Sequence, residues 1–470
     1  MSPFVSLDKI KKAYFVGIGG VSMSSLAIIL KNRNVNVCGY DLYHSANTEM
    51  LEGMGIPIDY NHDLSKLSDV DTVIYTAAVN ETTAPELKYA KDNGITLLTR
   101  AQLLGLVTSA YKYSVGVSGT HGKSTTTGMI ASIYLAHDEK SSVISGCVIP
   151  QISSSYKIGD SDERVVFEAC EYKDSFLSMR PSLKVILNCK HDHVDYFKDI
   201  DAVKASFRKY AEIPNVNPEA ENLTVANLDC ENTVSALENA DTKVYYYSIE
   251  KDADFCAKNI EIVNGCGVFD IYQNGKCILE KVKLRVPGLH NISNATASAA
   301  ASILSDVSTN AVRRGLEGFG GVSRRFERKG FCGGAEIVDD YAHHPDEIFV
   351  TLNTAKTLNK NRIICVFQPH TYSRTKAMLC DFAKALSLAD KVILAPIYPA
   401  REENIYGIES SHLAELIDGC EVIDGFDNIA KYLEGIVSEG DLVITMGAGE
   451  AYKAGDILLS LKNEQGDTIF

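Results

Sequence analysis

A glycine-rich segment near residue 120 carries the strongest sign of chemistry in this sequence. A β-branched run leads into a turn and a helical pattern, which together contain Gly119, Thr120, His121, Gly122, Lys123, Ser124 and Thr125. Backbone amides in such a turn, with a helix N-terminus behind them, surround a polyphosphate. Lys123 would reach the β- and γ-phosphates, and the Ser124 hydroxyl would bind Mg²⁺. The segment predicts an ATP site. The spacing from Gly116 to Gly122 exceeds the strict motif by one residue, so an ordinary glycine-rich turn is the alternative.

Two further segments could supply metal ligands. The stretch VVFEACEY places Glu168 at the end of a buried strand, and LNCKHDHVDY places His191, Asp192, His193 and Asp195 after the next strand. A metal bound to transferring phosphates needs carboxylate or imidazole ligands at strand ends that face the phosphate loop. Alone, the histidine–aspartate cluster is more often a solvated loop, and Glu168 could pair with a lysine. The nearby glycine turn favours the metal site.

A second glycine-rich turn lies near the N-terminus. It contains Gly17, Gly19, Gly20 and Ser22 between a strand and a helix, and Asp41 follows about 20 residues later. This pattern is close to the dinucleotide-binding fingerprint and alone would suggest an NAD-dependent oxidoreductase. It also suits any nucleotide diphosphate on a helix N-terminus. Two nucleotide sites in one chain favour a nucleotide-activated substrate plus ATP.

The elements that must position these residues alternate between short β-branched runs and helical stretches, which predicts an α/β protein with parallel sheets covered by helices. We expect three domains: a Rossmann-like N-terminal domain over residues 1–110, a central P-loop ATPase-type domain over 111–322 and a C-terminal Rossmann-like domain over 323–470. Specific expectations include strands at Lys12–Ile18 and Tyr113–Val117, β-hairpins within Val244–Leu284, and helices at Lys123–Ala136 and Arg374–Leu388.

Composition restricts the class of protein. The chain has 470 residues, a net charge of −15, 45 % hydrophobic residues and 12 scattered cysteines. These values exclude disorder and coiled coil, and they argue against nucleic-acid or membrane partners. Neither a signal peptide nor an apolar run near the ~20 residues of a membrane span is recognisable. Cysteine spacing indicates neither a zinc site nor a disulfide framework. We therefore expect a soluble cytoplasmic protein.

With these pieces in order, the sequence resembles the Mur ligases, the ATP-dependent amide-forming enzymes of peptidoglycan precursor synthesis. Matching blocks cover nearly the whole chain and include GIGGVSMSSLA, SGTHGKSTTT, DHVD, PGLHNISNATA, DDYAHHPDEI, FQPHTYSRTK, YPARE and MGAGE. The match is nearest to the alanine-adding branch. The resemblance implies one domain each for UDP-N-acetylmuramate, ATP and L-alanine, with Mg²⁺ as cofactor and an acyl-phosphate intermediate. It also implies a monomer or homodimer.

The resemblance assigns roles residue by residue. The blocks that bind the UDP moiety contain Gly17, Gly19, Gly20, Ser22, Asp41, Thr76 and Arg100. The ATP site takes the glycine turn from Gly119 to Thr125 together with His290, Asn291, Asn294 and Arg325. The metal ligands would be Ser124, Glu168 and His193. The amino-acid region contains Tyr341, His343, His344 and Arg374. Catalysis would rest on Lys123, His193, His343 and Arg374.

Some of these motifs allow more than one interpretation. The His-His-Pro turn could be only a capped helix start, and Asn291 could be a helix N-cap. Cys170 replaces an Asp that many members carry, and Thr371 replaces an Arg that some members carry. Phe207 lies near the place where other branches have a modified lysine, which argues against carbamylation here. Either His343 or Asp340 could accept the amine's proton. A ligase that reattaches a recycled peptide shares several of these blocks, so substrate tests must separate the two branches.

Overall fold

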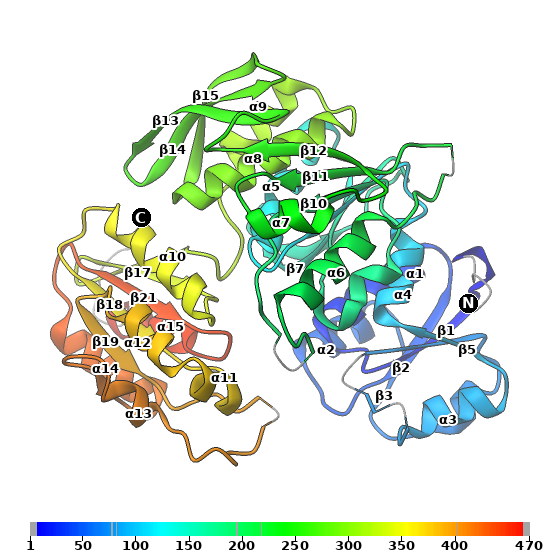
Figure 1. Cartoon of the computed structure of the whole chain (residues 1–470). Coiled ribbons are helices and arrows are strands. Elements are labelled where there is room, and N and C mark those ends of the chain that lie inside the picture. Colours follow the sequence, from blue (N-terminus) through cyan, green and yellow to red (C-terminus); the bar gives the residue numbers. More distant parts are fainter. Residues whose placement is uncertain are drawn as a thin grey trace. The chain divides into compact units, whose positions relative to one another are not determined.

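The computed structural model describes residues 7–76, 79–80, 82–193, 196–217, 219–400 and 402–463. Three separate sheets with intervening helices confirm the predicted α/β class with three sheet-containing domains (Figure 1). The chain divides into two compact units. The first comprises Met1–Lys258, Asp270–Glu280 and Ser293–Gly318, and the second comprises Asn259–Phe269, Lys281–Ile292 and Phe319–Phe470. The boundaries at residues 110 and 322 stay predictions.

The first sheet, in the first unit, has the strand order β3-β2-β1-β4-β5. Its strands are β1 (Lys12–Val16), β2 (Asn36–Tyr40), β3 (Ile58–Asp59), β4 (Thr72–Tyr75) and β5 (Thr96–Thr99). Its helices are α1 (Val21–Asn32), α2 (Ala46–Gly53), α3 (Pro85–Asp92) and α4 (Arg100–Thr108). Because β1 pairs in parallel with both β2 and β4, the strand order reverses at β1. Ligands of open parallel sheets bind beyond the strand ends at such a point.

The second sheet has the order β15-β14-β13-β12-β11-β10-β6-β9-β7-β8. Its strands are β6 (Tyr113–Ser118), β7 (Ser142–Ile149), β8 (Ser154–Lys157), β9 (Arg164–Glu168), β10 (Leu183–Ile186), β11 (Leu223–Asn227), β12 (Lys243–Ser248), β13 (Phe255–Val263), β14 (Cys266–Gln273) and β15 (Lys276–Pro287). The associated helices are α5 (Lys123–His137), α6 (Ile200–Ala211), α7 (Glu231–Leu237), α8 (Leu289–Ile303) and α9 (Thr309–Gly318). Strand β6 lies between β10 and β9, parallel to both. The expected hairpins are confirmed, since both residues of the Asn264–Gly265 and Asn274–Gly275 turns have positive φ, as two-residue hairpin turns require.

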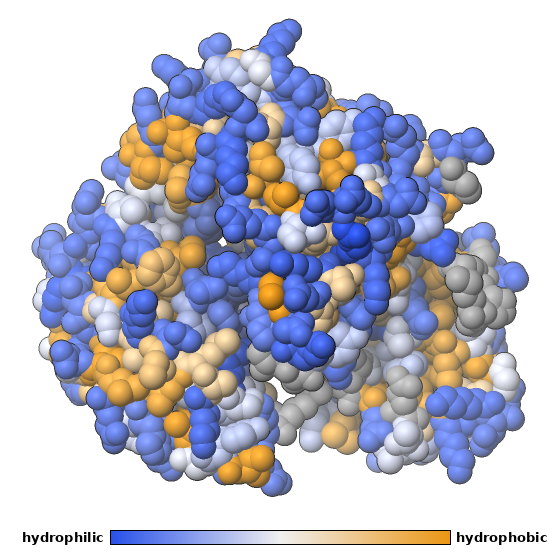
Figure 2. All heavy atoms as spheres, in the orientation of Figure 1, coloured by the Kyte–Doolittle hydropathy of each residue, from blue (hydrophilic) through white to orange (hydrophobic). Residues whose placement is uncertain are grey.

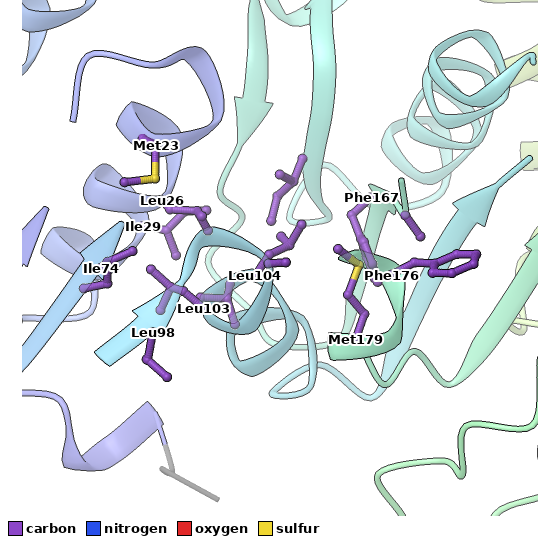
Figure 3. Packing of buried hydrophobic residues seen from close by; sticks show 14 of the residues in the cluster. Met23, Leu26, Ile29, Ile74, Leu98, Leu103, Leu104, Phe167, Phe176 and Met179 are labelled. Atoms are coloured by element: carbon purple, nitrogen blue, oxygen red, sulfur yellow. The ribbon is translucent and has the colours of Figure 1, made fainter. Parts of the chain in front are cut away.

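One hydrophobic core joins the first two sheets within the first unit. It includes Met23 and Leu104 from helices of the first sheet, and Phe167 and Met179 from the second (Figure 3). Helix α4 packs closely enough that a Cβ on Gly105 would lie 2.1 Å from the Ser178 carbonyl oxygen. This packing fixes α4 against the segment that follows β9.

The third sheet, in the second unit, has the order β16-β17-β21-β18-β19-β20. Its strands are β16 (Glu327–Cys332), β17 (Ala335–Asp340), β18 (Ile363–Phe367), β19 (Lys391–Leu394), β20 (Glu421–Val422) and β21 (Leu442–Met446). Among the strand pairs described in this sheet, β16 and β17 are antiparallel and the others are parallel. The helices are α10 (Pro345–Lys356), α11 (Tyr372–Ala377), α12 (Leu379–Leu386), α13 (Ser410–Ala414), α14 (Phe426–Ile436) and α15 (Tyr452–Asn463). The single helix expected over Arg374–Leu388 is wrong, because the backbone leaves the helical conformation at Met378, with φ −117° and ψ 25°.

The surface and the cysteines agree with the composition. Hydrophilic residues predominate on the face in Figure 2, with apolar patches scattered among them. In the described part of the chain, none of the helices is long and apolar enough to cross a membrane. The twelve cysteines are all free thiols.

Candidate functional site

The glycine turn between β6 and α5 has the backbone conformation that its sequence predicts. Gly119 has φ +140° and Gly122 has φ +87°, which side chains disfavour. A Cβ on Gly119 would lie 2.9 Å from Cβ of Leu187, and one on Gly122 would lie 2.9 Å from Oδ1 of Asn294. Gly122 is the N-cap of α5 and provides no side-chain acceptor for the helix's first amides. The turn can therefore offer backbone amides to an anion.

The loop that follows β10 holds this turn in place. The backbone amides of Thr120 and His121 donate to the carbonyl oxygen and Oδ1 of Asn188, at 3.1 and 2.8 Å. The Asn188 amide donates in return to the His121 carbonyl at 3.0 Å. The Thr120 hydroxyl is within hydrogen-bonding distance of the backbone of Lys190. Asn188 lies two residues after β10, and no motif in the sequence indicated its role.

Lys123 forms a buried ion pair with Glu171. Its Nζ lies 3.0 and 3.1 Å from the carboxylate oxygens, and the two side chains are 17 % and 3 % exposed. Nζ also donates to the carbonyl oxygens of Gly119 and Thr120, at 2.5 and 3.1 Å. Burial would lower the pKa of Lys123, but neighbouring groups, chiefly Glu171 and Cys170, together outweigh it and the pKa is raised. Burial would likewise raise the pKa of Glu171, but the Lys123 charge and the hydrogen bond with His193 together outweigh it, so the pKa of Glu171 is lowered.

The candidate metal ligands lie at one edge of the second sheet. Glu168 ends β9, and its Oε1 accepts hydrogen bonds from the Gly146 amide at 2.7 Å and the Ser145 hydroxyl at 3.1 Å. His193 follows β10, with its Nε2 3.7 Å from Oε1 of Glu171. Because β10, β6 and β9 are neighbours, Ser124, Glu168 and His193 all extend from the carboxyl ends of adjacent strands. A hydroxyl, a carboxylate and an imidazole there, beside phosphate oxygens, suit Mg²⁺. Asp195 lies outside the described residues.

His191 and Asp192, the other polar residues of this loop, make local contacts. His191 Nε2 lies 3.0 Å from the Phe197 carbonyl oxygen, and Asp192 Oδ1 accepts the His193 amide at 2.6 Å. These contacts shape the loop that carries His193.

The predicted UDP-binding residues come together at the carboxyl edge of the first sheet. The Gly19 amide donates to Asp41 Oδ2 at 2.7 Å. Gly17 has φ +81°, and a Cβ there would lie 2.8 Å from Cγ2 of Thr76. Gly20 is the N-cap of α1 and again provides no side-chain acceptor. These contacts leave the start of α1 open to an anion such as a diphosphate.

Arg100 connects this edge to the acidic segment after β9. Its Nη1 donates to the Ser22 hydroxyl at 3.1 Å. Burial lowers the pKa of the Arg100 guanidinium overall, although Cys170 and Glu168 favour its charged form. The two predicted nucleotide sites of the first unit are thus linked through the shared core.

In the second unit, strand β17 ends in a carboxylate that organises the surrounding backbone. Asp340 accepts the amides of Phe326 and Ala342, both at 2.8 Å. Burial raises its pKa to about 6. Arg324 and Phe326 both have positive φ and flank Arg325, whose guanidinium lies 5.3 Å from the ring centroid of Tyr341. The strained turn therefore presents Arg325 beside the predicted amino-acid region.

The two adjacent histidines of DDYAHHP have different environments. His344 is the N-cap of α10, and its Nδ1 accepts the Asp346 amide at 3.2 Å, so the capped-helix interpretation fits this residue. His343 Nδ1 lies 3.1 Å from the Tyr341 carbonyl oxygen and 3.3 Å from Glu347 Oε2. Burial, reinforced by Arg374, lowers the pKa of His343 to about 4, although Glu347 works in the opposite direction.

The residues predicted near adenine begin helix α8. His290 is exposed, and the side-chain amide of Asn291 donates to the Pro287 carbonyl oxygen at 2.7 Å. Asn294 lies one turn further along and contacts the position of the Gly122 Cβ. No role was predicted for Glu171 or Glu347, although they lie in the motifs VVFEACEY and DDYAHHPDEI.

Three family models match the chain: the Mur ligase family catalytic domain over residues 12–112, the Mur ligase middle domain over 117–302 and the Mur ligase glutamate ligase domain over 324–449. The UDP-N-acetylmuramate–L-alanine ligase of Caldicellulosiruptor saccharolyticus is 43 % identical over 453 residues, covering 95 % of this chain and 98 % of that protein. The ligase of the same name from Clostridium perfringens is 40 % identical over 455 residues, covering 96 % and 98 %.

Solved structures give the same comparison in three dimensions. The UDP-N-acetylmuramate–alanine ligase of Thermotoga maritima matches with a TM-score of 0.78 and 28 % identity, covering 97 % of this chain and 100 % of that one. A murein peptide ligase from Psychrobacter arcticus matches with a TM-score of 0.67 and 24 % identity, covering 96 % and 98 %, which shows the fold alone.

Proposed function

This chain belongs to the Mur ligase family, and on that premise we propose that it joins L-alanine to UDP-N-acetylmuramate, converting ATP to ADP and phosphate. The substrates follow from the near-full-length similarity to alanine-adding ligases. The use of ATP is supported mainly by the glycine turn before α5, which lacks a side-chain cap and contacts the Lys123 ammonium group. We also propose that the protein acts in the cytoplasm as a monomer or homodimer.

The first step is phosphorylation of the sugar's carboxylate by ATP, because a carboxylate alone is a poor electrophile. The turn amides and Lys123 bind the phosphates and neutralise charge that develops during the transfer. Lys123 must exchange its contacts with Gly119 and Thr120 for phosphate oxygens. Mg²⁺, held by Ser124, Glu168 and His193, would supply further neutralisation when bound.

The second step is attack by the amine of L-alanine on the acyl phosphate, which releases phosphate. We infer that His343, and not Asp340, accepts the amine's proton. Asp340 already accepts two backbone amides and is buried, whereas the lowered pKa of His343 keeps its imidazole neutral near pH 7. Arg374, at the start of α11, would bind the α-carboxylate.

The test is phosphate release with ATP, Mg²⁺ and UDP-N-acetylmuramate, comparing L-alanine, glycine, L-serine and a short peptide as acceptors. We expect release that depends on both the UDP-sugar and L-alanine, and its loss in Lys123→Ala. Glu336→Gln is the folded control, since Glu336 pairs with Arg328 and Lys360 at the opposite end of β17 from Asp340. Peptide-dependent release would instead assign the chain to the peptide-recycling branch, and no release with any acceptor would refute the proposal.

A further inference from the structure

We propose that Glu347 is a positioning residue that fixes the tautomer and ring orientation of His343, so that Nε2 of the imidazole takes the proton of the incoming amino group. The inference rests on the proposed function, because it names how the amine of L-alanine becomes a nucleophile. It concerns residues of the second unit alone.

Glu347 is the third residue of α10 and lies beside His343. Its Oε2 accepts the backbone amide of His343 at 3.1 Å and lies 3.3 Å from Nδ1 of the same residue. The side chains of Glu347 and His343 are 13 % and 19 % exposed. One carboxylate oxygen therefore holds both the backbone and the ring of His343, in a setting that mostly excludes water.

The contacts of Nδ1 determine where the ring carries its proton. Nδ1 faces the Tyr341 carbonyl oxygen at 3.1 Å and the Glu347 carboxylate at 3.3 Å. A carbonyl and a carboxylate can only accept hydrogen bonds, so the proton must lie on Nδ1. In the neutral ring, Nε2 then carries the free lone pair, as in sites where a carboxylate orients a histidine.

Burial first, and then charged groups from several elements, set the balance between the neutral and charged states of His343. Glu347 on α10 favours the imidazolium, whereas Arg374 on α11 and Arg325 before β16 oppose it. The ring of His370, after β18, lies 5.9 Å from the ring of His343. The imidazole is therefore neutral before the reaction, and the carboxylate stabilises the charge that it acquires.

The amino group loses two protons as the amide forms. Nε2 accepts the first proton from the ammonium group of L-alanine, and the freed nitrogen lone pair forms a bond to the acyl carbon. The bond between that carbon and the phosphate oxygen breaks, and phosphate leaves with the electron pair and takes up the second proton of the nitrogen. The imidazolium then returns its proton to water. Glu347 touches none of the reacting atoms: its Oε2 acts through His343, and its Oε1 lies 3.7 Å from Nη1 of Arg325.

A purely structural role for Glu347 is the competing explanation, since an acidic residue in the first turn of a helix also stabilises the helix. Glu347→Gln distinguishes the two. The amide keeps the size of the side chain and an oxygen for the His343 amide, but it loses the charge, and its NH₂ group can donate to Nδ1 and favour the wrong tautomer. Glu336→Gln neutralises another buried carboxylate at the far end of β17 and serves as the matched control.

The experiment compares L-alanine with hydroxylamine, a nucleophile that is uncharged at neutral pH and needs no base. For Glu347→Gln we expect kcat with L-alanine to fall about 10- to 100-fold with little change in KM, as for a lost orienting partner. Phosphate release with hydroxylamine should stay within about twofold of the unmodified protein, because its attack needs no proton acceptor. Equal losses with both nucleophiles, or an unchanged kcat with L-alanine, would overturn the inference.

A second measurement needs no turnover and separates this inference from the proposed function. Nitrogen NMR of ¹⁵N-histidine-labelled protein, with His343→Gln identifying the signals, should show His343 neutral and protonated on Nδ1 at pH 7. A proton on Nε2 would overturn the inference even if L-alanine proves to be the substrate. If the tautomer is as expected but the unmodified protein releases phosphate only with another acceptor, the proposed function fails while the positioning role stands.

Discussion

Replacing Glu171 by glutamine should destabilise the glycine turn measurably, because Lys123 would keep its charge without its counter-ion. At a separation of 3.0 Å, Coulomb's law with an effective dielectric constant of ~20 gives an attraction of about 5 kcal/mol. Desolvation of both groups offsets much of this value, and removing one partner of a buried pair costs about 3–5 kcal/mol. The carbonyls of Gly119 and Thr120 still accept from Lys123, so we expect the lower end, about 3 kcal/mol.

The assay is a double-mutant cycle with Lys123→Met, read by hydrogen exchange of peptides that cover residues 113–137, and by far-UV circular dichroism during urea unfolding. Circular dichroism is preferred because the chain contains no tryptophan. Each single change should cost about 3 kcal/mol, and the double change should cost at least about 1 kcal/mol less than their sum. As a control, Glu221→Gln removes an exposed pair with Lys243 and should cost less than about 1 kcal/mol.

The reasoning would be refuted by either of two results. The first is a cost for Glu171→Gln no larger than that of the exposed control. The second is strict additivity of the two changes, which would mean that Lys123 and Glu171 do not interact energetically despite their distance.

Three further predictions concern the other elements of the site. His344→Ala should lower the free energy of unfolding by about 1 kcal/mol through loss of the α10 cap, with KM for L-alanine nearly unchanged; a large rise in KM would place His344 in the amino-acid site instead. Burial raises the pKa of Asp340 from 3.8 to about 6, so its stabilising contribution is present below pH 4 and lost as pH rises through 6. The stability of Asp340→Asn, measured by urea unfolding, should therefore improve relative to the unmodified protein by about 2 kcal/mol between pH 4 and pH 7; parallel pH curves would contradict this. In Gly19→Ala, the added methyl group would lie 2.8 Å from Thr48 and 2.9 Å from Asp41. KM for the UDP-sugar should therefore rise at least about tenfold, while KM for ATP stays unchanged. Equal rises in both KM values would argue for a general loss of structure.

Local backbone rules made the glycine turns predictable from sequence. Gly119 and Gly122 adopt the positive φ values that a turn between a strand and a phosphate-binding helix requires. The Asn-Gly pairs likewise identified the hairpins, because both positions of such turns need positive φ. The conformation depends there on two or three adjacent residues, so the sequence pattern suffices.

Pairings between distant segments were not predictable in the same way. Glu168 and Glu171 are three residues apart in one acidic motif, and the sequence could not indicate which one faces Lys123. The answer depends on the turn after β9, where Lys173 and Asp174 both have positive φ although neither is glycine. The break between α11 and α12 at Met378 was missed for a related reason, since an apolar residue there continues the helical pattern.

Glu171 and Asp340 are both buried carboxylates, but their pKa values are shifted in opposite directions. Glu171 faces the ammonium of Lys123 and keeps its charge, whereas Asp340 accepts backbone amides and its pKa rises. Burial disfavours the charge in both cases. At Glu171 the Lys123 charge and the hydrogen bond with His193 together outweigh burial, whereas at Asp340 the Arg325 charge and the two backbone amides do not. Acidity within these sites therefore follows from the balance between burial and partners and not from burial alone.

Pairing also explains how a chain with a net charge of −15 can bind anionic substrates. Lys123 lies 3.0 Å from Glu171, and Arg325 lies 3.7 Å from Glu347, so two of the cations assigned to nucleotide binding have carboxylate partners before any substrate arrives. Each partner holds its cation in place and lowers the cost of burying it. The same carboxylates compete with incoming phosphates, which weakens the binding of substrate and product alike. A ligase that must release ADP and phosphate after every turnover needs cations that are fixed in position but not too strongly attractive, and buried carboxylate partners meet both requirements.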